Sequence, residues 1–449
     1  MKNLLLYLTS LLTFSANSQC WESVSAGGSH TTAIMTDGSM WSWGPNFYGE
    51  IGVGNTDMQY TPVRVGMAND WAVLDLGASH NLAIKDDGTL WAWGSNEEGS
   101  VGDGTTIDRT TPFQLGTATN WASLGNGYAT SMAIKTDGTL WSWGYGTNFQ
   151  HANGSSNNVL TPQQVGSDSD WQTVSGGYSF TTALKTDGTL WAWGSNDYGQ
   201  LGDGTNVSRQ IPVQIGSDNN WSTISSSGYH NVAMKDDGSL WSWGDNFDGQ
   251  IGDGTNTNRN TPVQIGNSGE WQAAEAGFFH TIAIKTDGTL WSWGQNSNGQ
   301  LGIGNQIDQE TPIQVGTDTN WSKLSGGAYF SMAMKSDGTL WGFGLNHLGQ
   351  LGQGEEFFGF AEPVEVSCSA LSNNDLVLSE FQIYPNPATE ILNIESDVKI
   401  IGFTVTDLLG KQVSSGSQSS INVQHLQSGI YFIKITTVEG TSLKKFIKL

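Results

Sequence analysis

The sequence repeats itself every 50 residues, without slippage, from Trp21 to the region of Pro363. Each of seven units opens with a tryptophan and carries Asp-Gly at one fixed later position, as in Asp187-Gly188. A fixed period of this length is typical of chains built from one supersecondary unit that packs on its neighbours. The opening residues are Trp21, Trp71, Trp121, Trp171, Trp221, Trp271 and Trp321.

Each unit carries the signals of four short β-strands. Asp-Gly between two alternating apolar runs favours a tight hairpin, and we expect a type I′ turn, in which both central residues have positive φ. One strand should follow the opening Trp, two should flank Asp-Gly, and the fourth should begin at a proline such as Pro212. Four strands in each of seven repeats predict an all-β, seven-bladed β-propeller.

The apolar residues indicate how the blades pack. The third strand places two tryptophans on one face, as with Trp41 and Trp43, and the second strand always carries an alanine, such as Ala33. All 20 tryptophans lie in the repeats, and Phe343 replaces the one missing from the pattern. We expect the bulky face of one blade to pack on the small face of its neighbour.

Two segments resemble the regulator-of-chromosome-condensation repeat. They are the run 28–34, Gly-Ser-His-Thr-Thr-Ala-Ile, and the run 193–204, which contains Gly-Gln-Leu-Gly-Asp-Gly. The resemblance recurs seven times over about 350 residues and implies a seven-bladed propeller. The third repeat departs from the pattern between Tyr145 and Gly154, which lacks the Gly-Gln-Leu-Gly element.

The ends of the chain differ from the repeats. Residues 1–18 have the pattern of a secretory signal peptide, with Lys2, a short apolar run and Ala16-Asn17-Ser18 before the expected cleavage. We therefore predict a signal peptide at 1–18, the propeller at 19–368, a polar linker at 369–378 and a C-terminal domain at 379–449.

The C-terminal segment has no tryptophan and alternates apolar with polar residues, which indicates a β domain. Its motifs resemble the type A C-terminal sorting domain of the bacterial type IX secretion system. The resemblance implies a small β-sandwich that the secretion machinery recognises, and a product that is secreted or held at the outer cell surface. The matching residues are Pro385, Asn386, Pro387, Gly429, Tyr431, Lys434 and Lys448.

The chain has two cysteines, Cys20 and Cys368, which flank the repeats. If the first blade meets the last, the two thiols come close, so we predict a disulfide that locks the ring. The alternative is that Cys20 is a lipid-acceptor cysteine.

The formal net charge is −24. Residues 371–449 hold seven acidic and six basic residues, which leaves 35 acidic and 12 basic residues in the first 370. This acidity disfavours nucleic acids and anionic membrane surfaces as partners. After the signal peptide, no segment is long and apolar enough to span a membrane.

Motifs for chemistry are missing from the sequence. It has no paired-cysteine metal motif, no His-Glu-x-x-His and no phosphate loop with a lysine, so we expect no catalytic residue, metal or cofactor. Four histidines share one position of the repeat, which points to structural hydrogen bonds. These are His30, His80, His230 and His280, and His151 lies apart from them in the divergent third-repeat loop.

Aromatic residues precede that histidine position in blades three to seven. We name Tyr128, Tyr178, Tyr229, Phe278, Phe279 and Tyr329 the aromatic crescent. In a propeller these turns gather at one end of the axis, where exposed aromatic rings indicate a binding surface. The alternative is rim packing between neighbouring blades.

The sequence therefore predicts a monomeric extracellular binding or adhesion module that recognises a protein or a glycan. One alternative is an extracellular hydrolase or lyase of polysaccharide, which would need two carboxylates converging across the axis. The other is a guanine nucleotide exchange-like regulator, which the family name suggests and the export signal contradicts.

Overall fold

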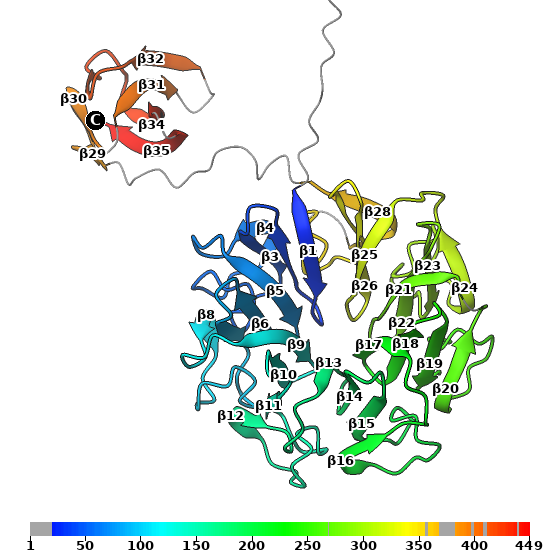
Figure 1. Cartoon of the computed structure of the whole chain (residues 1–449). Coiled ribbons are helices and arrows are strands. Elements are labelled where there is room, and N and C mark those ends of the chain that lie inside the picture. Colours follow the sequence, from blue (N-terminus) through cyan, green and yellow to red (C-terminus); the bar gives the residue numbers. More distant parts are fainter. Residues whose placement is uncertain are drawn as a thin grey trace, which may run out of the picture. The chain divides into compact units, whose positions relative to one another are not determined.

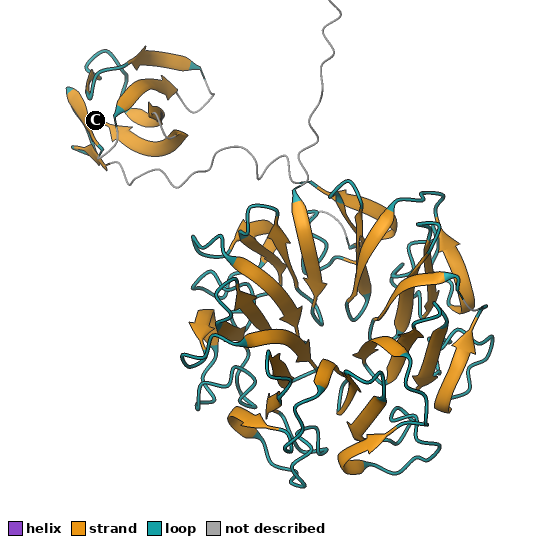
Figure 2. Cartoon of the chain, in the orientation of Figure 1, coloured by secondary structure: helices purple, strands orange, loops and turns teal. Residues whose placement is uncertain are grey.

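The computed structural model describes residues 20–267, 269–354, 358–367, 382–396, 399–406, 411–437 and 440–449. The chain divides into two compact units, Met1–Val366 and Ser367–Leu449. Every regular element among the described residues is a β-strand (Figure 2), so no helix there is long and apolar enough to cross a membrane. The predicted signal peptide and linker lie outside the described residues.

The first unit contains seven four-stranded antiparallel sheets, each made of four consecutive strands, arranged around an axis (Figure 1). The predicted seven-bladed propeller is confirmed. The first strands, which line the axis, are β1 (Trp21–Ala26), β5 (Trp71–Leu76), β9 (Trp121–Asn126), β13 (Trp171–Gly176), β17 (Trp221–Ser227), β21 (Trp271–Ala276) and β25 (Trp321–Gly326). The second strands are β2 (Thr31–Met35), β6 (His80–Lys85), β10 (Thr130–Lys135), β14 (Phe180–Lys185), β18 (His230–Lys235), β22 (His280–Lys285) and β26 (Phe330–Lys335).

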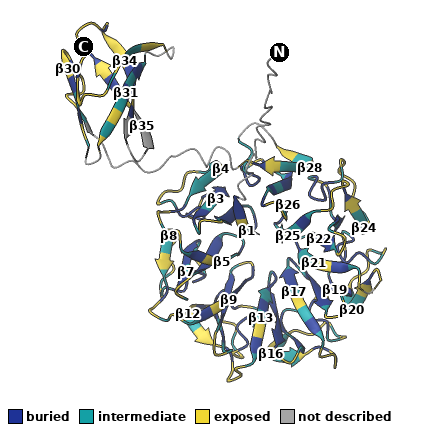
Figure 3. Cartoon of the chain, turned by 45° about the horizontal axis from the view of Figure 1, so that its top comes forward, coloured by how far each residue is buried: buried dark blue, intermediate teal, exposed yellow. Residues whose placement is uncertain are grey.

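The outer half of each blade completes the sheet. The third strands are β3 (Met40–Gly44), β7 (Leu90–Gly94), β11 (Leu140–Gly144), β15 (Leu190–Gly194), β19 (Leu240–Gly244), β23 (Leu290–Gly294) and β27 (Leu340–Leu345). The fourth strands are β4 (Gln59–Arg64), β8 (Arg109–Gln114), β12 (Val159–Gln164), β16 (Arg209–Gln214), β20 (Arg259–Ile265), β24 (Gln309–Val315) and β28 (Gly359–Val366). Burial falls toward these outer strands (Figure 3).

The Asp-Gly hairpin lies where the sequence places it, but its turn type was predicted wrongly. The N–H of Gly188 donates to the carbonyl of Lys185 at 2.9 Å, and Lys185 N–H donates to Thr189 at 3.1 Å. Gly188 has φ of 78°, whereas Asp187 is not among the residues with positive φ. The turn is therefore a type I turn followed by a left-handed glycine. The Asp187 carboxylate accepts the Thr189 N–H at 3.1 Å, which stabilises this form.

The blades pack face to face as predicted. Leu184 and Leu190 of the fourth blade share one apolar cluster with Ala233 and Trp243 of the fifth. Trp243 is fully buried, and its indole N–H donates to the Gln200 carbonyl of the preceding blade at 3.1 Å. Burial of one such ring contributes about 2–3 kcal/mol.

The fourth strand begins three residues earlier than predicted. Pro212 lies inside β16, which starts at Arg209. The prediction was wrong because this is the outermost strand of its sheet. Its free edge needs no N–H donor, so a proline fits within the strand.

The ring closes between the first and seventh blades. The indole N–H of Trp43 donates to the Gln350 carbonyl at 3.0 Å, and Trp21 N–H donates to the Gly338 carbonyl at 3.3 Å. Because each sheet consists of consecutive strands, no strand is shared between the two ends of the repeat region. Contacts between blade faces therefore close the ring.

The second unit is a small β-sandwich, as predicted. One sheet has the order β29 (Gln382–Tyr384), β30 (Ile391–Glu395) and β33 (Ser420–Asn422). The other has the order β32 (Gln412–Gly416), β31 (Ile400–Thr406), β34 (Gly429–Thr437) and β35 (Gly440–Lys448). Leu392 and Ile421 from the first sheet share one core with Phe403 and Ile433 from the second.

Candidate functional site

The aromatic crescent lies on one face of the propeller. In an antiparallel sheet, the turn between the first two strands and the loop between the last two come to the same end. The two segments meet directly, because Asp245 N–H donates to the Tyr229 carbonyl at 3.0 Å. The Asp-Gly hairpins lie at the opposite end of the blades.

The six predicted rings form one continuous cluster. Tyr128 contacts Tyr178 with ring centroids 4.4 Å apart, and Tyr178 contacts Tyr229 at 5.2 Å. Tyr128 also contacts Phe278 at 6.3 Å. Phe278 then contacts Phe279 at 6.3 Å, and Phe279 stacks on Tyr329 at 5.3 Å. The structure thus brings together residues that are up to 201 positions apart in the chain, from Tyr128 to Tyr329.

None of these rings is buried. Tyr128 and Tyr329 are exposed, at 41% and 36%, and the other four are partly buried. The interior of the blades is filled by other aromatic residues, since Trp193, Trp243 and their equivalents have no exposed surface. The crescent therefore contributes a partly apolar surface rather than a core.

The sequence analysis missed Tyr198, which extends the cluster. Its ring lies 5.0 Å from that of Tyr229, and it is 40% exposed. Tyr198 belongs to the long loop after β15, where its N–H donates to the Gln200 side chain at 2.9 Å. The sequence shows a tyrosine in this loop, but only the fold shows that the loop lies on the same face as the crescent.

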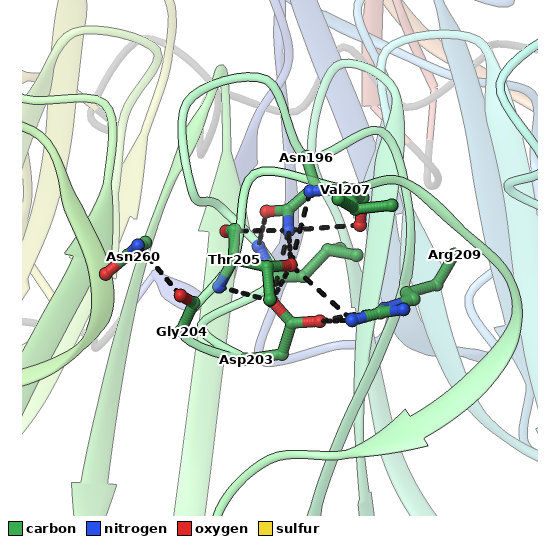
Figure 4. Close-up of polar contacts among 8 residues, drawn as sticks. Asn196, Asp203, Gly204, Thr205, Val207, Arg209 and Asn260 are labelled. Carbon is green, nitrogen blue, oxygen red and sulfur yellow. Dashed lines mark hydrogen bonds and ion pairs between the residues drawn. The ribbon is translucent and has the colours of Figure 1, made fainter.

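The loop that carries Tyr198 is held by its own hydrogen bonds (Figure 4). Asn196 Nδ2 donates to the Thr205 carbonyl at 3.0 Å, and Asn196 Oδ1 accepts the Leu201 N–H at 2.9 Å. Asp203 accepts the Thr205 N–H at 2.9 Å and the Arg209 Nε–H at 2.8 Å. The Gly-Asp-Gly segments of this kind are therefore turns that Asp and Arg side chains stabilise.

Carboxylates surround the crescent. Glu97 and Glu98 line a depression of about 200 Å³ that also contains Tyr48 and Tyr128. Asp245 lies beside Tyr229, and burial raises the pKa of its carboxyl. The arginines that begin β8, β16 and β20 are each paired with an aspartate, as Arg209 is with Asp203. The face is aromatic and acidic.

A channel about 250 Å³ in volume runs along the axis beneath the crescent. Its mouth is lined by Tyr128, Tyr178 and Phe278, and its wall by the first strands of the blades. Two carboxylates, Asp75 and Glu275, lie in this wall. Burial raises the pKa of each to about 7. The sequence analysis missed both residues, although each interrupts a repeat position otherwise held by Ser or Gly.

The four repeat histidines make structural hydrogen bonds, as predicted, and the structure shows that their partners lie in the neighbouring blade. His30 Nε2 lies 2.9 Å from Asn81 Oδ1, and His230 Nε2 lies 3.0 Å from Thr281 Oγ1. All four rings are buried, which lowers their pKa to about 4 for His30 and His80 and about 3 for His230 and His280. They are neutral structural groups.

The divergent third-repeat loop keeps the backbone path of its equivalents. Phe149 and Ala152 have φ of 68° and 52°, at positions where the fourth repeat has Gly199 and Gly202. His151 is buried, donates Nε2–H to the Gly144 carbonyl at 3.0 Å and accepts the Ser142 hydroxyl at 2.7 Å. It is a structural residue as well.

Cys20 is buried, at 8% exposed, whereas Cys368 lies outside the described residues. The disulfide stays a prediction. Among the described residues, no group of three or more His, Cys, Asp or Glu side chains is placed to hold a metal ion.

The sorting-domain residues gather around the C-terminal strand. Asn386 accepts the Ile447 N–H at 2.9 Å, and Gly429 pairs with Lys448 in the sheet. Tyr431 is buried and stacks on Phe446 at 5.6 Å. Pro385 and Pro387 flank Asn386 in the same segment, while Lys434 lies further along β34 and is exposed. The separate motifs thus lie along the C-terminal strand β35.

Family models match both the propeller and the C-terminal domain. The model of the RCC1-like domain matches residues 9–278, which is more than half of the chain. The chain belongs to the RCC1-like domain family. Models of the regulator of chromosome condensation (RCC1) repeat also match residues 287–334, and residues 272–300 and 321–350. The secretion system C-terminal sorting domain matches residues 382–449, which indicates export by type IX secretion to the cell surface or the extracellular space.

Solved structures similar to this RCC1-like chain support the fold. A chain of the crystal structure of Kap60 bound to yeast RCC1 (Prp20) has a TM-score of 0.65 and 19% identity, covering 82% of this chain and 88% of that one. Human WBSCR16 has a TM-score of 0.63 and 20% identity, covering 71% and 88%. At these identities the likeness concerns the fold alone.

Among curated proteins, the Arabidopsis thaliana ultraviolet-B receptor UVR8 is 42% identical over 50 residues. The match spans 11% of this chain and 11% of the receptor, which is the length of one repeat.

Proposed function

We propose that this protein is an extracellular binding module that captures a protein or glycan on the face formed by the aromatic crescent. The proposal rests on one observation: the six rings form an unbroken chain of contacts around the channel mouth, and none of them is buried. Clustered Tyr and Phe side chains supply contact area at low entropic cost. The mature protein acts as a monomer and is released or attached at the cell surface.

The alternative of rim packing explains the contacts between the rings but not their exposure. Rings needed only for stability would be expected to lie in the interior, where the tryptophans of the third strands already fill the space between blades. The acidic surroundings of the crescent also favour a ligand of complementary charge.

The test is ligand capture by the full chain, immobilised and screened against defined extracellular proteins and a glycan array. We expect Tyr178→Ala with Tyr229→Ala to weaken capture at least about tenfold, since central aromatic residues dominate binding energies. Phe113→Ala with Ile211→Ala is the matched control, because both side chains are exposed on outer strands. Equal capture by all three proteins would move the site away from the crescent.

One observation favours a second candidate, an extracellular hydrolase or lyase. Asp75 and Glu275 are two carboxylates in the wall of one channel, and most glycoside hydrolases use two carboxylates that flank the bond to be cleaved. Release of reducing ends from polysaccharides by the full chain, abolished by Glu275→Gln, would support it. Binding without product formation would exclude this candidate for the glycans tested.

A further inference from the structure

The wall of the axial channel contains a ring of seven equivalent positions, four residues after each opening tryptophan. Five of them hold a small residue, and the blades are thereby close together at the axis. The seven residues are Ser25, Asp75, Gly125, Ser175, Ser225, Glu275 and Ser325. Asp75 and Glu275 are the two ionisable members.

Serines of this ring accept hydrogen bonds from backbone N–H groups of the next blade. Ser325 Oγ accepts the Ala26 N–H at 2.8 Å, and Ser175 Oγ accepts the Ser226 N–H at 2.9 Å. These bonds satisfy groups at the inner edge of the blades, where the first strands have no further neighbour in their own sheet. A serine hydroxyl makes this bond at other positions of the ring, so the bond does not require the negative charge of a carboxylate.

The two carboxylates both lie in the wall of the channel. They belong to the second and sixth blades, which are three blade steps apart and so lie across the axis. Glu275 accepts the Ser225 hydroxyl at 2.6 Å, and Asp75 accepts a backbone hydrogen bond from Asn126. The negative charge of Glu275 adds to the burial that raises the pKa of Asp75.

Six lysines of the propeller lie at the hairpin end of their blades, away from the channel. Lys185 lies between the rings of Trp171 and Trp191, at 4.9 and 4.7 Å, and pairs with Asp168 at 2.7 Å. The position between two tryptophan rings recurs for Lys85, Lys135, Lys235, Lys285 and Lys335 at the hairpin end of their blades. No Lys or Arg of the described residues lines the channel.

The mouth of the channel suits a positive charge. Tyr128, Tyr178 and Phe278 surround it, and the faces of aromatic rings attract ammonium and guanidinium groups. A cation that enters therefore meets ring faces first and carboxylates further in. The channel volume of about 250 Å³ accepts a side chain but not a folded domain.

We infer that the axial channel binds an organic cation, namely a Lys or Arg side chain that a protein partner inserts past the aromatic mouth to lie between Asp75 and Glu275. This inference rests on the proposed function and specifies its ligand: the partner is a protein whose contact surface carries an extended basic residue. The acidic groups Glu97, Glu98 and Asp245 on the same face complement the basic surroundings of that residue.

The probes are butylguanidine and butylamine, which reproduce the two side chains, and 1-butanol as the neutral equivalent. Isothermal titration calorimetry of the full chain at pH 8 should show saturable binding of both cations and none of the alcohol. Asp75→Asn with Glu275→Gln should weaken cation binding at least about tenfold. The matched control is Asp86→Asn with Asp236→Asn, which removes the same charge from exposed turns at the opposite end of the blades and should leave binding unchanged.

Other results would overturn the inference. They include no binding of either cation by the wild-type chain, equal weakening in both double variants, and displacement of the cations by calcium chloride at equal concentration, which would indicate a metal site. The titratable groups lining the channel are Asp75, Glu275, Tyr128 and Tyr178, so binding should weaken from pH 8 to pH 5.5 as the carboxylates take up protons. If the crescent variants lose ligand capture but no cation binds, the inference fails and the proposed function stands.

Discussion

His280 in the sixth blade donates its Nε2 proton to the hydroxyl of Ser331 in the seventh, across 2.7 Å. The direction is fixed because Ser331 donates its own proton to the Gln300 carbonyl at 2.9 Å. The same relay, from a histidine through a polar side chain to a loop carbonyl, joins His230 to Thr281 and Gln250. The neutral imidazole is thus part of the interface between blades.

This relay predicts acid sensitivity. The pKa of His280 is about 3 in the folded chain, below its unfolded value, so the unfolded chain binds more protons as the pH falls below about 6.5. Stability is therefore present above pH 6.5 and lost toward pH 4. The free energy of unfolding, measured by chemical denaturation, should fall between pH 7.5 and pH 4.5. In the double variant His280→Phe with His230→Phe, we expect this fall to be smaller than in the wild type by about 2 kcal/mol for each histidine replaced. Phe180 and Phe330 show that the ring fits this position.

The channel carboxylates predict the opposite dependence. Their pKa of about 7 lies above the unfolded values, so the folded chain binds more protons between pH 4 and pH 7 and loses stability as the pH rises through that range. Asp75→Asn with Glu275→Gln should raise the free energy of unfolding at pH 8 by about 2–4 kcal/mol. At pH 5 the two proteins should differ little. A variant less stable than the wild type at pH 8 would mean that the carboxylates support the fold.

The third-repeat loop predicts a stabilising substitution. Ala152 has φ of 52°, which costs a non-glycine residue about 1–2 kcal/mol. Ala152→Gly should therefore raise the free energy of unfolding by about 0.5–1 kcal/mol after the entropic cost of glycine. The reciprocal change, Gly202→Ala, should destabilise the chain, because the new Cβ would lie 2.8 Å from Trp243 Nε1. Thermal melts of both variants would settle the order.

The predicted Cys20–Cys368 disulfide has a direct test. Peptide mapping of the mature protein, with and without reduction, should show one linked pair, and reduction should lower the melting temperature. Closure of a loop this long contributes on the order of 5 kcal/mol in the chain-entropy model. Alkylation of both thiols without prior reduction would contradict the pairing.

The sequence was most informative where one residue type recurs under one physical constraint. Asp187-Gly188 and the pair Trp191 and Trp193 located the hairpin and the third strand, because a turn and a packed face tolerate few residues. The start of β16 was misplaced, since a proline is compatible with an edge strand as well as with a strand end.

The candidate site was only partly predictable. The crescent was found because its residues occupy two adjacent repeat positions, but Tyr198 lies in another loop and joins them only through the fold. Asp75 and Glu275 were overlooked because each is an isolated departure from a repeat position that otherwise holds Ser or Gly. The sequence alone does not show that these two residues, 200 positions apart, line the same channel.

Each blade is a sheet of four consecutive strands, and the two ends of the repeat region meet. Trp21 bonds to Gly338, and Val366 pairs with Leu340 two residues further along. A segment of 50 residues that begins at an opening tryptophan therefore contains all four strands of one blade. A short peptide bridging these ends would allow new termini to be cut between any two blades, and a gene segment coding for 50 residues could be exchanged as a cassette that carries its own portion of the binding face.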